Sequence, residues 1–309
     1  MEVLITGGSG FIGRALAERL DGRHHVTLLA RRGGEGVVQG DVTRPETLQD
    51  LESFEVIYHL AAELDESLPY GELRRVNVLG TTNVLRMAKG MGARLIYLST
   101  AGVLGPTPTP AREEDAYNPQ TAYEETKAEA ERLVIGFSRS EGLRSIVLRP
   151  PIVYGENRHW QKILRAVKRG FPIIGDGRNR FHLVYIKNLL QAMEKALEAE
   201  GCGEVYHVAD PRAYTLEQVY NIMAEELGVG PPRRHLPVAM AKGLALLWEA
   251  EGRLRRKEPF LSRALIERLV RERAYDISKA ERGLGYRPEY DFREGIREVI
   301  GGFRARGIL

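Results

Sequence analysis

The segment Thr6-Gly7-Gly8-Ser9-Gly10-Phe11-Ile12-Gly13 stands at the start of the chain, between the apolar run Val3–Thr6 and the amphipathic stretch Phe11–Leu20. This order predicts a strand, a tight turn and a helix. The glycines at positions 7, 10 and 13 allow a sharp turn, a close approach of the backbone to a phosphate, and close packing of the helix on the strand. The helix N-terminus would bind the phosphates of a dinucleotide. A glycine-rich turn that binds nothing is the weaker alternative.

The alternation of strand and helix continues through the first half of the chain. Further buried strands are predicted at Val26–Ala30, Val56–Leu60, Arg94–Leu98 and Ser145–Leu148, and further helices at Leu73–Lys89 and Tyr123–Arg139. Such alternation indicates a parallel sheet covered by helices on both faces. We therefore expect an α/β fold in which residues 1–150 form a Rossmann-type, doubly wound dinucleotide-binding domain.

The pattern becomes mainly helical after Pro150 and Pro151. Helices are predicted at His159–Arg169, Ile186–Ala199, Leu216–Leu227, Val238–Leu247, Ser262–Arg271 and Phe292–Phe303, and short strands at Phe171–Ile174, His182–Tyr185 and Glu204–Val208. Residues 151–309 are expected to form mainly a smaller, mostly helical substrate-binding lobe. Some of its later segments are expected to return to the first domain.

The composition is that of a soluble globular protein, with 43% hydrophobic and 28% charged residues among 309. No apolar run approaches the roughly 18 residues of a membrane span, and the N-terminus does not resemble a signal peptide. The single cysteine, Cys202, favours a reducing cytoplasm. The 45 basic and 42 acidic residues are interspersed, which argues against a nucleic-acid partner. No metal site is predicted.

The second predicted strand ends in Arg31 and Arg32. An acidic residue at this place would bind the ribose 2′-hydroxyl of NAD, whereas arginine suits the 2′-phosphate of NADP. We therefore expect NADP, with Arg31 as the first choice for the contact, and we keep NAD as the alternative cofactor. Two exposed arginines without a ligand are the other interpretation.

Tyr123 and Lys127 stand four residues apart and so share one face of a predicted helix. A carbonyl that receives a hydride must also receive a proton. A free phenol titrates near about 10, but a nearby ammonium and an oxidised nicotinamide would favour the phenolate and lower the pKa. The spacing thus predicts an acid/base pair, with an ordinary surface pair as the alternative.

Other side chains are expected to gather around this pair. The strand Arg94–Leu98 runs into Ser99 and Thr100, and the strand ends of a parallel sheet face the cofactor crevice. Their hydroxyl groups could hydrogen-bond a substrate oxygen. Asn77, on the preceding helix, could support the site.

Taken in order, these segments resemble the extended short-chain dehydrogenase/reductase family, which includes nucleotide-sugar epimerases and dehydratases, dihydroflavonol reductases and 3β-hydroxysteroid dehydrogenases. The resemblance rests on Thr6–Gly13, Asp41, His59–Ala62, Asn77–Asn83, Ser99-Thr100, Tyr123 with Lys127, Leu148–Gly155, Tyr275–Ala280 and Leu284–Tyr286. It covers essentially the whole chain. Leu104 replaces the tyrosine that the family often has there, a change expected to affect packing rather than chemistry.

The resemblance implies a role for each matching residue. Thr100 would orient the substrate oxygen, Tyr123 would exchange the proton, and Lys127 would activate it. The predicted cofactor contacts are Gly7, Ser9, Gly10, Phe11, Ile12, Gly13, Arg31, Arg32, Asp41, Val42, Leu60, Ala61, Ala62, Asn77, Ser99, Tyr123, Lys127, Pro150, Ile152 and Val153. The resemblance also implies a homodimer through the helices Leu73–Lys89 and Tyr123–Arg139.

The substrate is less well specified. Nucleotide-sugar enzymes of the family place an arginine four residues after a Gly-Asp-Gly segment, where this chain has Phe181 after Gly175-Asp176-Gly177. Arg180 comes one residue early, and a shift of one residue points a strand side chain to the opposite face. The candidate substrate contacts are Ser99, Thr100, Arg178, Arg180 and His182, with a structural role equally open for the histidine.

The sequence therefore predicts an enzyme: an NADP(H)-dependent oxidoreductase that interconverts a carbonyl and an alcohol in a small-molecule substrate. A nucleotide-sugar epimerase or dehydratase with bound NAD is the alternative. A non-catalytic protein that senses NADP is a minor one.

Overall fold

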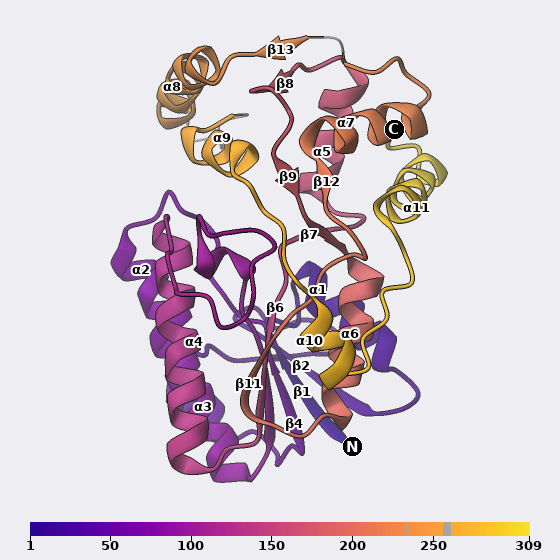
Figure 1. Cartoon of the computed structure of the whole chain (residues 1–309). Coiled ribbons are helices and arrows are strands. Elements are labelled where there is room, and N and C mark those ends of the chain that lie inside the picture. The colour runs from indigo at the N-terminus through magenta and orange to yellow at the C-terminus, as the bar shows by residue number, and fades with distance from the viewer. Residues whose placement is uncertain (233, 256–260) are drawn as a thin grey trace.

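The computed structural model describes residues 1–232, 234–255 and 261–309. Its centre is a seven-stranded sheet in the order β11-β6-β5-β4-β1-β2-β3, and every neighbouring pair is parallel (Figure 1). The strands are β1 (Glu2–Thr6), β2 (His25–Ala30), β3 (Val37–Gln39), β4 (Val56–His59), β5 (Arg94–Leu98), β6 (Ser145–Arg149) and β11 (Cys202–His207). The predicted doubly wound sheet is confirmed, and β11 returns to it from the second half of the chain.

Helices cover both faces of the sheet because successive side chains of a strand point to opposite sides. Val3 and Ile5 of β1 pack in one apolar cluster with α1 (Phe11–Leu20) and α6 (Ile186–Glu198). Leu4, between them, packs in a second cluster with α3 (Gly80–Met91) and α4 (Ala122–Glu141). Because both faces of the sheet are buried, the sequences of these strands are continuous apolar runs.

The strand order reverses between β1 and β4, because the chain first adds β2 and β3 on one side and then β4, β5 and β6 on the other. Ligands of open α/β sheets bind in the crevice at the carboxyl ends of the strands around such a point. The turn after β1, residues 60–62 after β4 and residues 99–100 after β5 all lie at this edge.

The predicted helix Leu73–Lys89 is interrupted in the structure. It begins with α2 (Tyr70–Arg74), continues through a π-helical turn at Arg75–Leu79, and ends with α3. Single π-helical turns inside α-helices are frequent at functional sites, and Asn77 lies in the middle of this one.

Most of the remaining elements form the second lobe, at the top of Figure 1. Its helices are α5 (Arg158–Lys168), α7 (Leu216–Leu227), α8 (Val238–Arg255), α9 (Arg263–Val270) and α11 (Phe292–Ala305). Short strands pair as β7 (Ile152–Tyr154) with β10 (Leu183–Tyr185), β9 (Arg180–Phe181) with β12 (Tyr214–Thr215), and β8 (Ile173–Ile174) with β13 (His235–Leu236). The short helix α10 (Ser278–Gly283) packs on β11. Among the described residues, no helix combines the length and apolarity that crossing a membrane requires.

Candidate active site

The glycine turn has the shape that a dinucleotide pyrophosphate needs. Gly7 has φ +72°, and a Cβ on it would lie 2.8 Å from the backbone nitrogen of Ala61. A Cβ on Gly13 would lie 2.6 Å from the carbonyl oxygen of Gly7. Gly10, the N-cap of α1, brings no side chain to the first N–H groups of the helix. These groups therefore face an open cradle with the positive end of the helix behind it.

The adenosine end of such a cofactor would reach the carboxyl ends of β2 and β3, which are neighbours in the sheet. Arg31 and Arg32 are exposed there, and Nη2 of Arg31 lies 3.7 Å from Oε2 of Glu63. Although burial opposes ionisation of Asp41, hydrogen bonds from Thr43 and the charge of Arg31 hold the pKa of its carboxyl below the ordinary value. An anionic carboxylate between cationic side chains suits a contact with the adenine edge and ribose.

His59 joins the first strands to the helix layer. Its ring nitrogens lie 2.8 Å from Oγ1 of Thr6 and 3.0 Å from Oγ1 of Thr81. Burial and the charge of Lys127 lower the pKa of His59 to about 3, so the ring is neutral at physiological pH. Leu60, Ala61 and Ala62 follow it and are half-buried at the crevice.

Asn77 connects the loop after β4 to α4. Its Oδ1 accepts a hydrogen bond of 2.7 Å from the backbone nitrogen of Glu63. Its Nδ2 donates to the carbonyl oxygen of Glu63 at 3.1 Å and to Oγ1 of Thr126 at 3.0 Å. These hydrogen bonds hold Asn77 in place, and through Thr126 it contacts α4, the helix that carries the predicted acid/base pair.

Lys127 is buried behind the crevice, with only 3% of its surface exposed. Its Nζ donates a 2.8 Å hydrogen bond to the carbonyl oxygen of Leu98 and lies 4.3 Å from the centre of the Tyr97 ring. Burial lowers the pKa of Lys127 to about 7, against the opposing effect of Glu131. The Lys127 amine is therefore only partly protonated at neutral pH.

Tyr123, one turn earlier on the same face of α4, differs from the expectation. Burial raises the pKa of its phenol well above the ordinary value, although the guanidinium of Arg268 opposes the rise. The cation that opposes the rise is thus the guanidinium of Arg268 and not the Lys127 ammonium that we expected to lower the pKa. The phenol is protonated at neutral pH and can donate its proton.

Thr100 and Tyr123 line one pocket of about 170 Å³. The other lining residues are Gly102, Glu124, Pro151, Ile152, Arg268 and Arg273. The pocket therefore brings the predicted catalytic hydroxyl groups together with two arginines of the second lobe.

Ser99 does not line this pocket, unlike its neighbour Thr100. It is buried and donates its hydroxyl hydrogen to Oε2 of Glu131. Glu131 forms a buried ion pair with Arg149 at 2.5 Å and accepts a 2.6 Å hydrogen bond from the Tyr117 hydroxyl. The Ser99 hydroxyl, predicted from the sequence to bind the substrate, instead donates its hydrogen bond inside this network.

The three substrate contacts predicted from the second lobe are not among the residues that line the pocket. Arg178 and Arg180 are exposed, and Nε of Arg180 pairs with Oε1 of Glu272 at 2.6 Å. His182 is buried; its Nε2 lies 2.8 Å from the carbonyl oxygen of Asp210, and its Nδ1 accepts from the backbone nitrogen of Tyr275 at 3.3 Å.

The pocket is lined instead by Arg268 and Arg273, neither of which is predicted from the sequence. The only signal was the arginine-rich run at residues 268–273, just before the segment that resembles the family's C-terminal pattern.

Comparisons with known proteins agree with this architecture. Residues 3–209 match the NAD dependent epimerase/dehydratase family. A 2-alkyl-3-oxoalkanoate reductase from Stenotrophomonas maltophilia is 28% identical over 97% of this chain and 98% of its own length. Short-chain dehydrogenase/reductase family 42E member 1 of Mus musculus is 30% identical over 99% of this chain and 88% of its own.

Solved structures show the same fold. A UDP-glucose 4-epimerase from Thermotoga maritima matches with a TM-score of 0.80 at 23% identity, over 99% of each chain. Other neighbours were solved with NADPH or with NAD bound.

Fold, crevice and relatives together define an NAD(P)-dependent oxidoreductase of the Rossmann type. The chain belongs to the NAD-dependent epimerase/dehydratase family, which confirms the resemblance to extended short-chain dehydrogenases/reductases.

Proposed function

We propose that this protein is an NADP(H)-dependent oxidoreductase that interconverts a carbonyl and an alcohol, and that it acts as a cytoplasmic homodimer on a small molecule. One observation carries the activity: Thr100 and Tyr123 face the same pocket, and Lys127 is buried one turn behind Tyr123 on α4.

The cofactor would be held by the chain's own residues along the sheet edge. The turn at residues 7–13 binds the pyrophosphate, and Arg31 with Arg32 binds the 2′-phosphate. Lys127 reaches the nicotinamide ribose. The dinucleotide, when bound, supplies or takes up the hydride, and the protein supplies position and electrostatics.

The side chains in the pocket then handle the proton. Thr100 hydrogen-bonds the substrate oxygen and fixes its direction, and its own Oγ1 is held by the backbone nitrogen of Gly102 at 3.1 Å. Tyr123, whose pKa is raised by burial, keeps its proton until negative charge develops on that oxygen and then donates it. The protonated phenol is the form of Tyr123 that reduction of a carbonyl requires.

Three of the relatives support reduction as the net reaction. Two matching proteins are named 2-alkyl-3-oxoalkanoate reductase, and a third is a ketoreductase of a farnesyl dihydroquinoline oxide. Their names describe transfer to a carbonyl rather than a hydride returned to the same substrate.

A nucleotide-sugar epimerase or dehydratase is the second candidate, favoured by the fold of solved neighbours. It would use the same pocket with tightly held NAD. Two observations disfavour it: Arg31 stands where a carboxylate would select NAD, and Phe181 is buried where an arginine would grip a diphosphate. An NADP sensor without catalysis would not need the Thr100, Tyr123 and Lys127 set.

Tyr123→Phe tests the proposal. We expect turnover of ketones and aldehydes with NADPH to fall by at least about 100-fold, because the proton donor is lost. NADPH affinity, measured by fluorescence titration, should stay unchanged. Tyr70→Phe, at an exposed tyrosine of α2, is the matched control. Retained turnover in Tyr123→Phe would refute the assigned role.

A further inference from the structure

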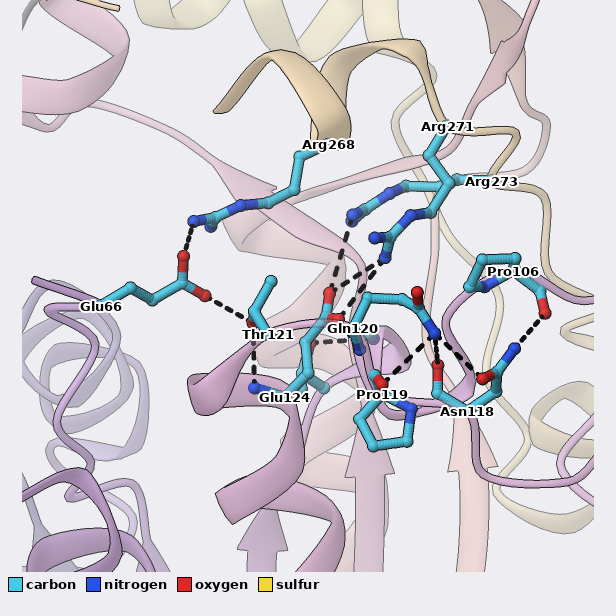
Figure 2. A network of polar contacts seen from close by, with 12 residues as sticks. Glu66, Pro106, Asn118, Pro119, Gln120, Thr121, Glu124, Arg268, Arg271 and Arg273 are labelled. Carbon is cyan, nitrogen blue, oxygen red and sulfur yellow. Dashed lines mark hydrogen bonds and ion pairs between the residues drawn. The ribbon is translucent and has the colours of Figure 1, made fainter. Parts of the chain in front are cut away.

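Three arginines of the second lobe gather over the N-terminus of α4. Arg268 belongs to α9, and Arg271 and Arg273 follow it; all three side chains reach toward the glutamates of the first domain (Figure 2). Arg268 and Arg273 line the pocket that also contains Thr100 and Tyr123. The reacting hydroxyl groups and a cationic wall therefore share one small cavity.

Two carboxylates face these three guanidinium groups. Glu66 pairs with Arg268 and accepts a 2.6 Å hydrogen bond from Oγ1 of Thr121. Glu124 lies 3.3 Å from Nη1 of Arg271 and 3.8 Å from Nη2 of Arg273. Three positive and two negative charges leave one positive charge in excess at this wall of the pocket.

Glu124 does not satisfy Arg273. Its Oε2 already accepts a 2.9 Å hydrogen bond from the backbone nitrogen of Gln120, and both of its oxygens lie nearer to Arg271. A separation of 3.8 Å is too long for a hydrogen bond. Glu124 thus acts as a shared and distant counterion for Arg273.

Arg273 is held in place with hydrogen-bonding capacity to spare. Its side chain is 6% exposed, and its Nε and Nη2 have no hydrogen-bond partner among the described residues. The backbone is fixed at both sides, since its nitrogen donates to Arg180 at 2.7 Å and its oxygen accepts from His182 at 2.8 Å. Burial lowers the pKa of the guanidinium, which marks a cation with too little compensation. A buried cation with unpaired N–H groups destabilises the folded protein unless a ligand accepts hydrogen bonds from it.

We propose that Arg273 binds a carboxylate of the substrate, so that this enzyme reduces an oxo acid. The proposal rests on the proposed carbonyl reduction at Thr100 and Tyr123. Guanidinium N–H groups match a carboxylate in a two-pronged geometry, and one added negative charge balances the excess at this wall. Arg273, Thr100 and Tyr123 line one pocket of about 170 Å³, so the carboxylate and the carbonyl of one small molecule, such as a 3-oxo acid, can contact all three side chains.

Binding of 3-oxooctanoate and of its neutral methyl ester to the full chain, by calorimetry in the presence of NADP, tests the subsite without depending on turnover. In the wild-type protein the acid should bind about 10- to 100-fold more tightly than the ester. Arg273→Gln should abolish this difference and leave ester binding within a few fold. Arg273→Lys should restore part of it, because a charge without the planar fork remains.

Arg212→Gln, at an exposed arginine of the second lobe, is the matched control and should keep the full preference for the acid. NADPH titration of each variant checks that the cofactor domain is folded. If the wild-type protein binds acid and ester equally, or Arg273→Gln keeps the preference, the subsite is disproved.

Two further measurements separate the proposals. UDP-glucose that binds more tightly than the acid and depends on Arg273 would make a diphosphate the natural anion and overturn the carboxylate. An acid that binds through Arg273 but does not oxidise NADPH would refute the reductase while the subsite stands. Acid and ester reduced equally by wild type and Arg273→Gln would refute the subsite while the reductase stands.

Discussion

Arg149 and Glu131 show how a single buried pair decides the role of a neighbouring residue. The two side chains are 1% and 0% exposed, and Ser99 and Tyr117 hydrogen-bond to the same carboxylate. Removing one partner of a buried pair costs about 3–5 kcal/mol, because an uncompensated charge remains. Ser99 therefore completes a structural network, and of the two neighbouring residues Ser99 and Thr100 it is Thr100 that lines the pocket.

Arg31→Asp is expected to reverse the cofactor preference from NADPH to NADH. Arginine attracts the 2′-phosphate, whereas aspartate repels it and accepts a hydrogen bond from the 2′-hydroxyl of NADH. Fluorescence titration with both cofactors should show a change of about 10- to 100-fold for NADPH. Arg234→Asp, at an exposed arginine of the second lobe, should change neither affinity. NAD that copurifies tightly with the wild-type protein would contradict the prediction and place the nucleotide-sugar epimerase first.

At the scale of elements, the π-helical turn between α2 and α3 is a product of tertiary contacts. The apolar spacing of Leu73–Lys89 predicts one continuous helix, and the helical direction is indeed kept. In this wider turn, the side-chain amide of Asn77 forms hydrogen bonds with both Glu63 and Thr126. Helical periodicity in the sequence cannot report a local change of winding whose cause lies in other elements.

Asp210 connects the end of β11 to the start of α6, and its titration should appear in stability. Its Oδ1 accepts hydrogen bonds from the Tyr185 nitrogen at 2.8 Å and from Asn188 Nδ2 at 2.7 Å. Burial raises the pKa of Asp210 from 3.8 to about 7. Between these values the folded protein keeps a proton that the unfolded chain has lost, so this group makes stability fall as pH rises.

Asp210→Asn should remove a slope of up to about 1.4 kcal/mol per pH unit. Urea unfolding of wild type and variant between about pH 4 and pH 7 measures the difference in slope. Asp276→Asn is the control, because hydrogen bonds from Ser278 lower the pKa of that carboxyl and move its titration out of this range. Parallel slopes for wild type and Asp210→Asn would show that Asp210 stays ionised throughout.

At the scale of the whole molecule, the helix layer formed by α4, α3 and the π-helical turn before α3 carries exposed leucines. Leu79 and Leu133 are 45% and 39% exposed. The resemblance to extended short-chain dehydrogenases/reductases implies a dimer through these helices, and exposed leucines are suited to such an interface.

The double variant Leu79→Glu with Leu133→Glu should be a monomer, because like charges would face each other across the symmetry axis. Light scattering coupled to size-exclusion chromatography measures the change. Leu247→Glu, at a leucine of α8 that is 68% exposed, should leave the dimer intact. A wild-type protein that runs as a monomer would remove the basis of this prediction.

The sequence by itself determined the class of fold and the family, and with them a nicotinamide cofactor. The glycine turn, the alternation of strands and helices, and the Tyr123–Lys127 spacing are local patterns, and the structure places them at one edge of the sheet. Strands of two or three residues in the second lobe, such as β9 and β12, are too short to show any periodicity. A feature could be predicted from the sequence wherever all of its residues lie in one short segment of the chain.

Only the tertiary structure decided which residues line the pocket and how burial shifts the pKa values of Tyr123 and Lys127. Arg268 and Arg273 reach the pocket because α9 folds back over the N-terminus of α4, far away in sequence. Burial raised the pKa of Tyr123 and lowered that of Lys127, and burial is a property of the packed molecule. The arginine wall of the pocket exists only after distant segments have come together, so no single stretch of sequence could specify it.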